Sequence, residues 1–144
     1  MTSPLLSIQN LCAAYEDNEV VTDVSFDVAY GETVCIVGES GSGKSSLLNA
    51  IHGISSVEVT DGKVLFEGTD MCSLSPSKRK ELLGPSIGLI PQNPAASFNP
   101  IRRYNVQFKE ALTSHGLEYD EDAILSMLAE IGIQRDRNVL HARP

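Results

Sequence analysis

Residues 38–45 read Gly38-Glu39-Ser40-Gly41-Ser42-Gly43-Lys44-Ser45, which is a complete G-x-x-x-x-G-K-[ST] phosphate loop. The glycines allow the backbone to curl so that successive N–H groups point into one concavity, where they bind anionic oxygens. Lys44 adds a positive charge that can reach the β- and γ-phosphates of a nucleotide, and the Ser45 hydroxyl suits Mg²⁺. The segment therefore predicts a nucleotide-binding site, with the positive end of the following helix against the phosphates.

The residues on either side of this loop support the prediction. Thr33–Val37 is a short apolar run, typical of a buried parallel strand. After the loop, Leu47, Leu48 and Ile51 mark one face of a helix, and Gly53 is placed to end it. A strand, the loop and a helix are the arrangement that the motif requires, whereas a glycine–serine linker matching by chance would lack both neighbours.

Composition places the chain among ordinary globular proteins. Its 144 residues suffice for one modest core, and 42% are hydrophobic and 21% charged. The net charge of −8 gives no indication of a nucleic-acid surface. The short basic clusters at 78–80 and 102–103 are interpreted as solvated faces.

Cysteine and histidine usage argues against disulfides and a metal centre. The three cysteines form an odd set without paired spacing, which suits a reducing compartment. His52, His115 and His141 are far apart in the sequence and have no ligand partner at metal-binding spacing. His52 falls near the end of the helix after the loop, where a positive charge is favoured. The N-terminus lacks the pattern of a secretory signal, and no apolar run approaches the ~20 residues that span a bilayer.

Local patterns predict further elements along the chain. Strands are expected at Leu5–Leu11, Val20–Val28, Val64–Gly68 and, as a buried strand, Ile87–Ile90, with a turn at Asp61-Gly62. Helices are expected from Pro76 to about Leu83 with Ser75 as the cap, over Val106–Leu112, and over Glu121–Ile131 with Ile124, Leu125, Leu128 and Ile131 on one face. The three prolines at positions 91, 94 and 100 predict a loop over Pro91–Pro100.

Several segments together resemble the nucleotide-binding subunit of an ABC transporter, most closely the peptide/nickel importer group, the dipeptide and oligopeptide permease ATPases. The resemblance covers essentially the whole chain. It is carried by Val24-Ser25-Phe26 followed by Gly31-Glu32, the phosphate loop, the Gly62–Gly68 hairpin followed by Asp70, Ile90-Pro91-Gln92-Asn93-Pro94 as a Q-loop, and Ser97-Phe98-Asn99-Pro100.

The resemblance implies the N-terminal part of an α/β phosphate-loop NTPase domain of the ABC type. Its parts would be an antiparallel β subdomain, a partial parallel core sheet and the start of the helical subdomain. Residues 1–92 would form the nucleotide-binding core with its β subdomain. Residues 93–144 would form the exit of the Q-loop and part of the helical subdomain.

The resemblance also assigns roles to residues that match the family pattern. ATP and Mg²⁺ are the implied ligands, and Tyr15 would stack on the adenine ring, for which a flat π face is suited. Ser45 and Gln92 would hold Mg²⁺, and Gln92 would also position the attacking water. The implied nucleotide-binding set is Tyr15, Gly38, Glu39, Ser40, Gly41, Ser42, Gly43, Lys44, Ser45 and Ser46. The alternatives are a partly exposed strand-end tyrosine for Tyr15 and an ordinary polar loop residue for Gln92.

Two motifs of the family are absent from these residues, namely a Leu-Ser-Gly-Gly-Gln-like signature and a Walker B strand ending in Asp-Glu. The sequence is therefore expected to stop just before the signature and to bind ATP without hydrolysing it alone. The expected partners are permease subunits and a second nucleotide-binding subunit, without nucleic acid, on the cytoplasmic face of the membrane. An incomplete sheet predicts exposed apolar edges and marginal stability or self-association.

Two other functions remain open from the sequence. One is a non-catalytic fragment that binds a nucleotide or another protein without turnover. The other is a different phosphate-loop enzyme, such as a small-molecule kinase or a GTPase. A GTPase should carry an Asn/Thr-Lys-x-Asp motif, which is absent, and a kinase has no need of Gln92 in its proline-flanked setting.

Overall fold

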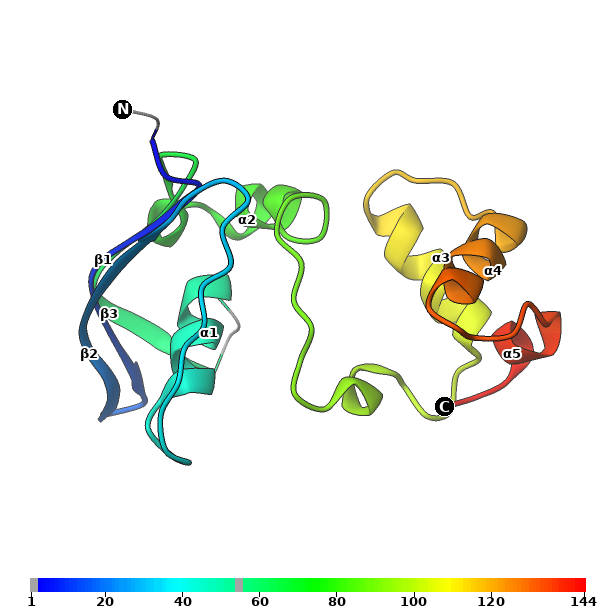
Figure 1. Ribbon diagram of the computed structural model, residues 1–144, viewed down its shortest axis with the longest axis horizontal. Coiled ribbons are helices and arrows are strands. Elements are labelled where there is room, and N and C mark those ends of the chain that lie inside the picture. The colour runs from blue at the N-terminus through cyan, green and yellow to red at the C-terminus, as the bar shows by residue number, and fades with distance from the viewer. Residues whose placement is uncertain (1–2, 54–55) are drawn as a thin grey trace. The chain divides into compact units, whose positions relative to one another are not determined.

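The structure is a computed structural model that describes residues 3–53 and 56–144 (Figure 1). Met1 and Thr2, the start of the segment considered for a secretory signal, lie outside the described residues. The chain divides into two compact units, up to Leu83 and from Gly84 onward, and each is described by itself. No helix within the described ranges combines the length and apolar character that crossing a bilayer requires.

The first unit contains a four-stranded sheet in the order β2-β1-β3-β4. The strands are β1 (Leu6–Tyr15), β2 (Asn18–Val28), β3 (Glu58–Phe66) and β4 (Thr69–Asp70), and every pairing among them is antiparallel. The predicted strands at Leu5–Leu11 and Val20–Val28 are thereby confirmed, with β1 extending to Tyr15. Of the predicted strand Val64–Gly68, only Val64–Phe66 is strand, as the end of the longer β3, and Glu67 and Gly68 form a turn before β4. The antiparallel sheet that the resemblance implied is present.

Helix α1 (Lys44–His52) contacts β1, β2 and β3 and closes the core of this unit. The sheet contributes the buried side chains of Ile8, Leu11 and Val64, and the helix contributes Leu47 and Ala50. The prediction that Leu48 shares the buried face is wrong, since its side chain is 47% exposed. At about 100° per residue, Ala50 lies nearer to Leu47 around the helix than Leu48 does, so Ala50 shares the buried face with Leu47. Gly53 ends the helix as predicted, with φ +74° and its N–H on the carbonyl of Asn49.

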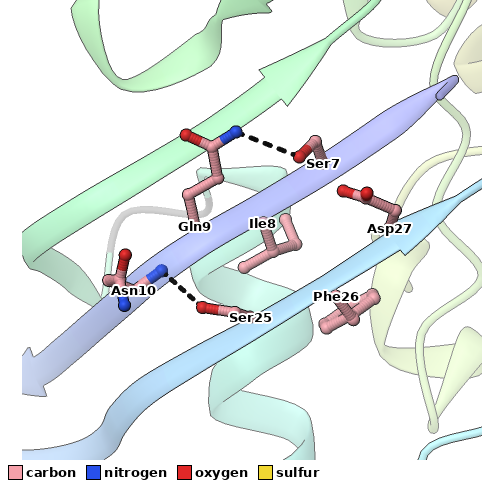
Figure 2. A pocket seen from close by; sticks show the side chains of 7 residues that line it. All are labelled: Ser7, Ile8, Gln9, Asn10, Ser25, Phe26 and Asp27. Carbon is pink, nitrogen blue, oxygen red and sulfur yellow. Dashed lines mark hydrogen bonds between the residues drawn. The ribbon is translucent and has the colours of Figure 1, made fainter. Parts of the chain in front are cut away.

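A bulge distorts β1 where it passes between β2 and β3. Asn10 has φ +48°, and its N–H donates to Ser25 Oγ at 2.8 Å instead of to a strand carbonyl (Figure 2). The pairing with β2 shifts between Ile8 and Leu11. Beside the bulge, β1 and β2 line a hollow of about 380 Å³. Figure 2 shows its lining side chains, with the Gln9 amide donating to Ser7 Oγ. The distortion lets the two strands twist while Ile8 stays in the core.

The predicted turn at Asp61-Gly62 is wrong, because β3 runs through both residues. Gly62 has φ +85° and lies opposite the bulge in β1, where the register shifts between Gln9 and Cys12. A Cβ atom at Gly62 would lie 2.3 Å from the carbonyl oxygen of Asn10. An Asp-Gly pair offers the positive φ that a hairpin turn needs, and a bulge uses the same property inside a strand.

The predicted partial parallel core sheet does not form within the described residues. Thr33–Val37 and Ile87–Ile90 are irregular segments without strand assignment over their length, and Val37 and Ile90 are 83% and 91% exposed. An apolar run has the composition of a buried strand, but it becomes one only when neighbouring strands satisfy its N–H and C=O groups. No strand of the described sheet pairs with either run.

The first unit ends in a short 3₁₀ segment, η1 (Met71–Ser73), and helix α2 (Pro76–Leu82). Ser75 caps α2 by accepting from the Lys78 N–H at 3.5 Å, and Pro76 occupies the first turn, which confirms both predictions. Arg79 donates from Nε to the Met71 carbonyl at 3.2 Å and reaches the space beside Gly53. This side chain therefore connects α2 to η1 and to the end of α1.

His52 in the last turn of α1 is expected to make stability depend on pH. Burial, and then the nearby Arg79 charge, lower the pKa of His52. These two effects therefore outweigh the preference of a helix C-terminus for a positive charge. Above pH ~6.5 the ring is neutral in both states; below it the unfolded chain binds the proton first, and the folded state loses stability. His52→Gln should therefore reduce the loss of unfolding free energy between pH 7.5 and pH 5.5, as measured by urea denaturation. A variant with the same pH dependence as the parent would contradict this.

The second unit contains the predicted proline-bounded loop with a 3₁₀ segment, η2 (Pro94–Ser97), followed by three helices. These are α3 (Tyr104–Ser114), α4 (Glu121–Glu130) and α5 (Arg137–His141), and the first two confirm the predicted helices. The core consists of Ile124, Leu125 and Leu140, with Phe108 and Leu128 packed against it. Ile131, expected on the same face, is instead the C-cap and is 74% exposed, because the helix ends one residue before it.

Candidate nucleotide-binding site

The phosphate loop connects the irregular segment at 33–37 to the start of α1. Gly41 and Gly43 have φ values of +83° and +86°, which L side chains rarely adopt, so both glycines are required by the loop's curvature. Gly43 is also the N-cap of α1. A Cβ atom there would lie 2.5 Å from the carbonyl oxygen of Val20, so the loop backbone passes directly against β2. The sheet thus fixes the position at which the helix begins.

Lys44 holds its positive charge inside this loop. Its Nζ donates to the carbonyl of Gly38 at 2.8 Å and to the carbonyl of Glu39, and it lies 3.4 Å from Ser42 Oγ. The N–H of Ser42 donates to the same Glu39 carbonyl at 3.3 Å, which closes the turn. The first and last parts of the motif are therefore drawn together around the ammonium group. An anionic ligand at this point would meet a full positive charge that is already positioned.

The first turn of α1 provides donors for an anion. An α-helix leaves its first N–H groups without intrahelical acceptors, and here no side chain caps them. The first turn also contains no acidic residue, so nothing within it opposes a negative ligand. Ser45 is exposed and Ser46 is half-buried at this end of the helix. The geometry suits phosphate oxygens, which are bound by helix N-termini through the same groups.

A pocket of about 250 Å³ lies between β2 and the loop. Its walls are apolar on the side of β2 and of the segment before the loop, and polar where the loop meets α1. The lining residues are Val20, Val21, Thr22, Val24, Ile36, Val37, Ser42, Gly43, Lys44 and Leu47.

Tyr15, the last residue of β1, lies beside the first two turns of α1. Hydrogen bonding from Ser46, and then from Asn49, lowers the pKa of the Tyr15 phenol despite its partial desolvation. The ring is half-buried, at the end of the strand. The structure therefore brings Tyr15 to the same helix as Lys44, Ser45 and Ser46, which is the grouping that the sequence predicted.

Gln92 belongs to the second unit, where it is exposed in the loop before η2. Its assignment to Mg²⁺ and to the attacking water stays a prediction. The donors assigned to magnesium, a serine hydroxyl and an amide oxygen, are hard oxygen ligands that suit this ion alongside phosphate oxygens. Among residues 3–53 and 56–144, no three His, Cys, Asp or Glu side chains come together as an independent metal site.

Asn49 is a polar neighbour of the site that the sequence prediction did not include. It lies three residues after Ser46, at the spacing that places two side chains on one side of a helix. That spacing was readable in the sequence, but it becomes informative only once Tyr15 is known to lie against this side of α1. Folding of β1 onto α1 supplies this information.

Comparisons with known proteins agree with the geometry. The sequence model of the family described as "ABC transporter" matches residues 21–142. The dipeptide transport ATP-binding protein DppD of Bacillus subtilis is 39% identical over 139 residues, covering 90% of this chain and 42% of its own length. The metal-staphylopine import system ATP-binding protein CntD of Staphylococcus aureus (strain Mu50) is 30% identical over 146 residues, covering 97% of this chain and 54% of its own length.

A solved structure shows the same fold. The dimeric structure of a bacterial ABC transporter cassette superimposes with a TM-score of 0.75 at 19% identity, covering 96% of this chain and 61% of that one. The predicted fold class, the N-terminal part of such a nucleotide-binding domain, is thereby confirmed, whereas the parallel part of its sheet is not formed here. The chain spans about half the length of the two relatives named above, 42% of DppD and 54% of CntD.

Proposed function

This chain belongs to the ABC transporter family, and on that premise we propose that it is the ATP-binding component of an importer for peptides or nickel. The observation that carries the proposal is the phosphate loop, closed around Lys44 at the uncapped start of α1. Similarity to proteins named for dipeptide transport and for metal-staphylopine import supports the solute class. Family membership also argues against the small-molecule kinase and GTPase alternatives.

In the proposed complex, the triphosphate lies at the start of α1 and the adenine ring lies on Tyr15. Loop N–H groups and the Lys44 ammonium bind the phosphate oxygens, and Ser45 and Ser46 add hydroxyl groups. The Ser45 hydroxyl would offer an oxygen ligand to Mg²⁺, which would neutralise phosphate charge when bound, and the Gln92 amide oxygen of the second unit is proposed as a further ligand. Lys44, proposed for the phosphates, and Ser46, a neighbour of Tyr15, lie in the same turn of α1. This closeness supports one continuous site from the phosphates to the base.

We propose that these residues bind ATP without hydrolysing it alone. Hydrolysis of a nucleoside triphosphate by phosphate-loop proteins uses a Walker B carboxylate to hold Mg²⁺ and a further group to orient the water. The 144 residues contain neither this strand nor a signature segment. In the transporter, ATP binding and hydrolysis would be coupled to transport through permease subunits and a second nucleotide-binding subunit, at the cytoplasmic face of the membrane.

The second candidate is a non-catalytic fragment that binds a nucleotide or another protein. The observation that favours it is the same absence of Walker B and signature residues from this sequence. Titration with Mg-ATP separates a chain that binds nucleotide from one that acts only through contacts with another protein. Saturable binding with phosphate release at background supports nucleotide binding without turnover, and absence of binding leaves only an interaction role.

Tyr15→Ala is expected to weaken Mg-ATP binding by ~1 kcal/mol, or about fivefold, because the ring face is lost. Stacking does not read hydrogen bonds, so Mg-GTP should be weakened by a similar factor. Isothermal titration calorimetry with both nucleotides and with Mg-tripolyphosphate measures the effect. Equal weakening of tripolyphosphate, which has no base, would contradict stacking.

A further inference from the structure

Asp61-Gly62 in β3 is the only Asp-Gly pair in the sequence, and no Asn-Gly pair occurs in it. The side-chain carboxyl of an aspartate can close a ring with the backbone nitrogen of the next residue. Glycine permits this approach because it has no Cβ atom in the way. Ring closure in a folded chain depends on how close the structure holds the carboxyl carbon and this nitrogen. The geometry of Asp61-Gly62 in β3 therefore decides how stable this peptide bond is chemically.

The structure holds the Asp61 side chain against the peptide group that follows it. The N–H of Gly62 donates to Asp61 Oδ1 at 2.7 Å. The carboxyl carbon is bonded to that oxygen at ~1.2 Å, so it lies within about 4 Å of the Gly62 nitrogen. Rotation about the Cβ–Cγ bond, which has a broad energy profile, turns the face of the carboxyl group toward this nitrogen. The contact is thus close to a reactive geometry, in which the atoms that bond are ~3–3.5 Å apart.

The bulge places this contact at an irregular point of the sheet. The register of β1 with β3 shifts between the pair that contains Lys63 and the pair that contains Asp61. Gly62 lies in that interval with φ +85°. Within the described residues, the pairing of β4 with the other edge of β3 is confined to Leu65 and Phe66. Asp61 is also exposed, so water reaches its carboxyl group.

We propose that Asp61 is a site of spontaneous backbone modification, at which the folded protein converts Asp61-Gly62 through a succinimide to isoaspartate. The Gly62 nitrogen bonds to Asp61 Cγ, and the proton of this nitrogen leaves with the carboxyl hydroxyl as one water molecule. Water then adds to either carbonyl of the five-membered ring. Opening at the side-chain carbonyl restores aspartate, whereas opening at the backbone carbonyl leaves the main chain running through Cγ. The two steps release and consume one water molecule and need no other reactant.

The isoaspartate form should weaken the sheet of the first unit. Its main chain is longer by one carbon atom between residues 61 and 62, where β1 and β3 approach closely. An atom at the Cβ position of Gly62 would already lie 2.3 Å from the carbonyl oxygen of Asn10. The longer chain therefore cannot keep Asp61 paired with Cys12 without a shift elsewhere in the ladder. Both strands also contact α1, so the change reaches the helix that begins at the phosphate loop.

The test compares ageing of the folded 144-residue protein with ageing of the same protein unfolded in guanidinium chloride, at one temperature and pH. Peptide mapping by mass spectrometry detects the succinimide by its loss of one water, and chromatography separates isoaspartate from aspartate. We expect isoaspartate at Asp61 to accumulate in the folded protein at least as fast as in the unfolded chain. Circular dichroism during the incubation verifies that the first sample stays folded. Slower accumulation in the folded protein would overturn the proposal, because the fold would then protect the pair.

Two controls separate this geometry from general ageing. Asp122 is exposed and precedes another small residue, Ala123, within α4. It should stay unmodified in the same folded samples, and equal modification there would contradict a special role of the bulge. Asp61→Glu keeps the negative charge but lengthens the side chain by one methylene, so ring closure at the nitrogen of Gly62 loses its geometry. This variant should show no water loss at residue 61, and an unchanged rate would likewise contradict the mechanism.

The effect on the sheet is measured on the modified protein itself. Chromatography separates the isoaspartate form from the parent, and urea denaturation followed by circular dichroism compares their midpoints. We expect a lower midpoint for the isoaspartate form, because the ladder of β1 with β3 is disturbed at the bulge. An unchanged midpoint would mean that the sheet accommodates the extra atom, and it would contradict the proposed weakening.

Discussion

Lys44→Ala is expected to lower the affinity for Mg-ATP by about 30-fold, corresponding to ~2 kcal/mol, because it should remove a charge-assisted hydrogen bond to the phosphates. The effect should be the largest of any single side chain in the site. The ammonium is held by the loop carbonyls of Gly38 and Glu39 without a ligand, so binding a phosphate costs little side-chain entropy at Lys44. Calorimetric titration of the parent and the variant measures the difference.

The matched control for this change is Lys63→Ala, which removes the same charge from an exposed position on β3. It should leave Mg-ATP affinity unchanged. Equal losses in both variants would mean that net charge, and not the phosphate loop, attracts the nucleotide. An unchanged affinity in Lys44→Ala would exclude the loop as the binding site.

Gly62→Ala is expected to destabilise the first unit by about 3 kcal/mol. Residue 62 has φ +85°, and an added Cβ would lie 2.3 Å from the carbonyl oxygen of Asn10 on the neighbouring strand. Neither the strand backbone nor the bulge can move without breaking the pairing of β1 with β3. Urea denaturation followed by circular dichroism measures the change in unfolding free energy.

Gly68→Ala provides the control for backbone strain without a clash. Its φ is +79°, close to that of Gly62, but an added Cβ would meet nothing within 4 Å. This variant should lose about 1 kcal/mol, the ordinary cost of a left-handed conformation. If both variants lost the same amount, the close approach at the bulge would have no energetic weight.

Features that depend on neighbouring residues in the sequence could be predicted. The phosphate loop, the Ser75 cap with Pro76 and the end of α1 at Gly53 are each set by local backbone chemistry. The apolar face of α4 is equally local, since Ile124 and Leu125 repeat at helical spacing. In these elements the sequence and the structure agree apart from one residue at an end.

Features that depend on distant partners could not be predicted in the same way. Thr33–Val37 has the composition of a buried strand and still forms none, because strand pairing requires a second segment that composition does not supply. Asp61-Gly62 has the chemistry of a turn, but pairing with β1 keeps both residues inside β3, opposite the bulge in β1. These two errors have one cause, which is that pairing partners decide the state of a β segment.

The candidate site divides along the same line. Residues 38–45 follow from a contiguous motif that leads into the start of α1. Tyr15 depends on the family resemblance, and the structure puts it against the same helix through the fold of β1 onto α1. Asn49 enters only from that contact, because nothing in its local sequence distinguishes it from a solvent-facing helix residue.

The exposed apolar segments bear on how the chain behaves in solution. Val37 and Ile90 carry large apolar side chains at 83% and 91% exposure in the structure. The expectation of marginal stability or self-association therefore keeps a physical basis. Binding measurements should be made over a range of protein concentrations, so that association is separated from ligand effects.

The most direct test of the nucleotide-binding assignment is thermal unfolding of the 144-residue chain with and without Mg-ATP, beside Lys44→Ala. At free ligand about 100-fold above Kd, binding to the folded state adds about 2.7 kcal/mol of stability. We expect a higher unfolding temperature for the parent with Mg-ATP and a much smaller change for Lys44→Ala at the same ligand concentration. An unchanged unfolding temperature in the parent at saturating Mg-ATP would contradict the assignment, since the folded loop would then bind no nucleotide.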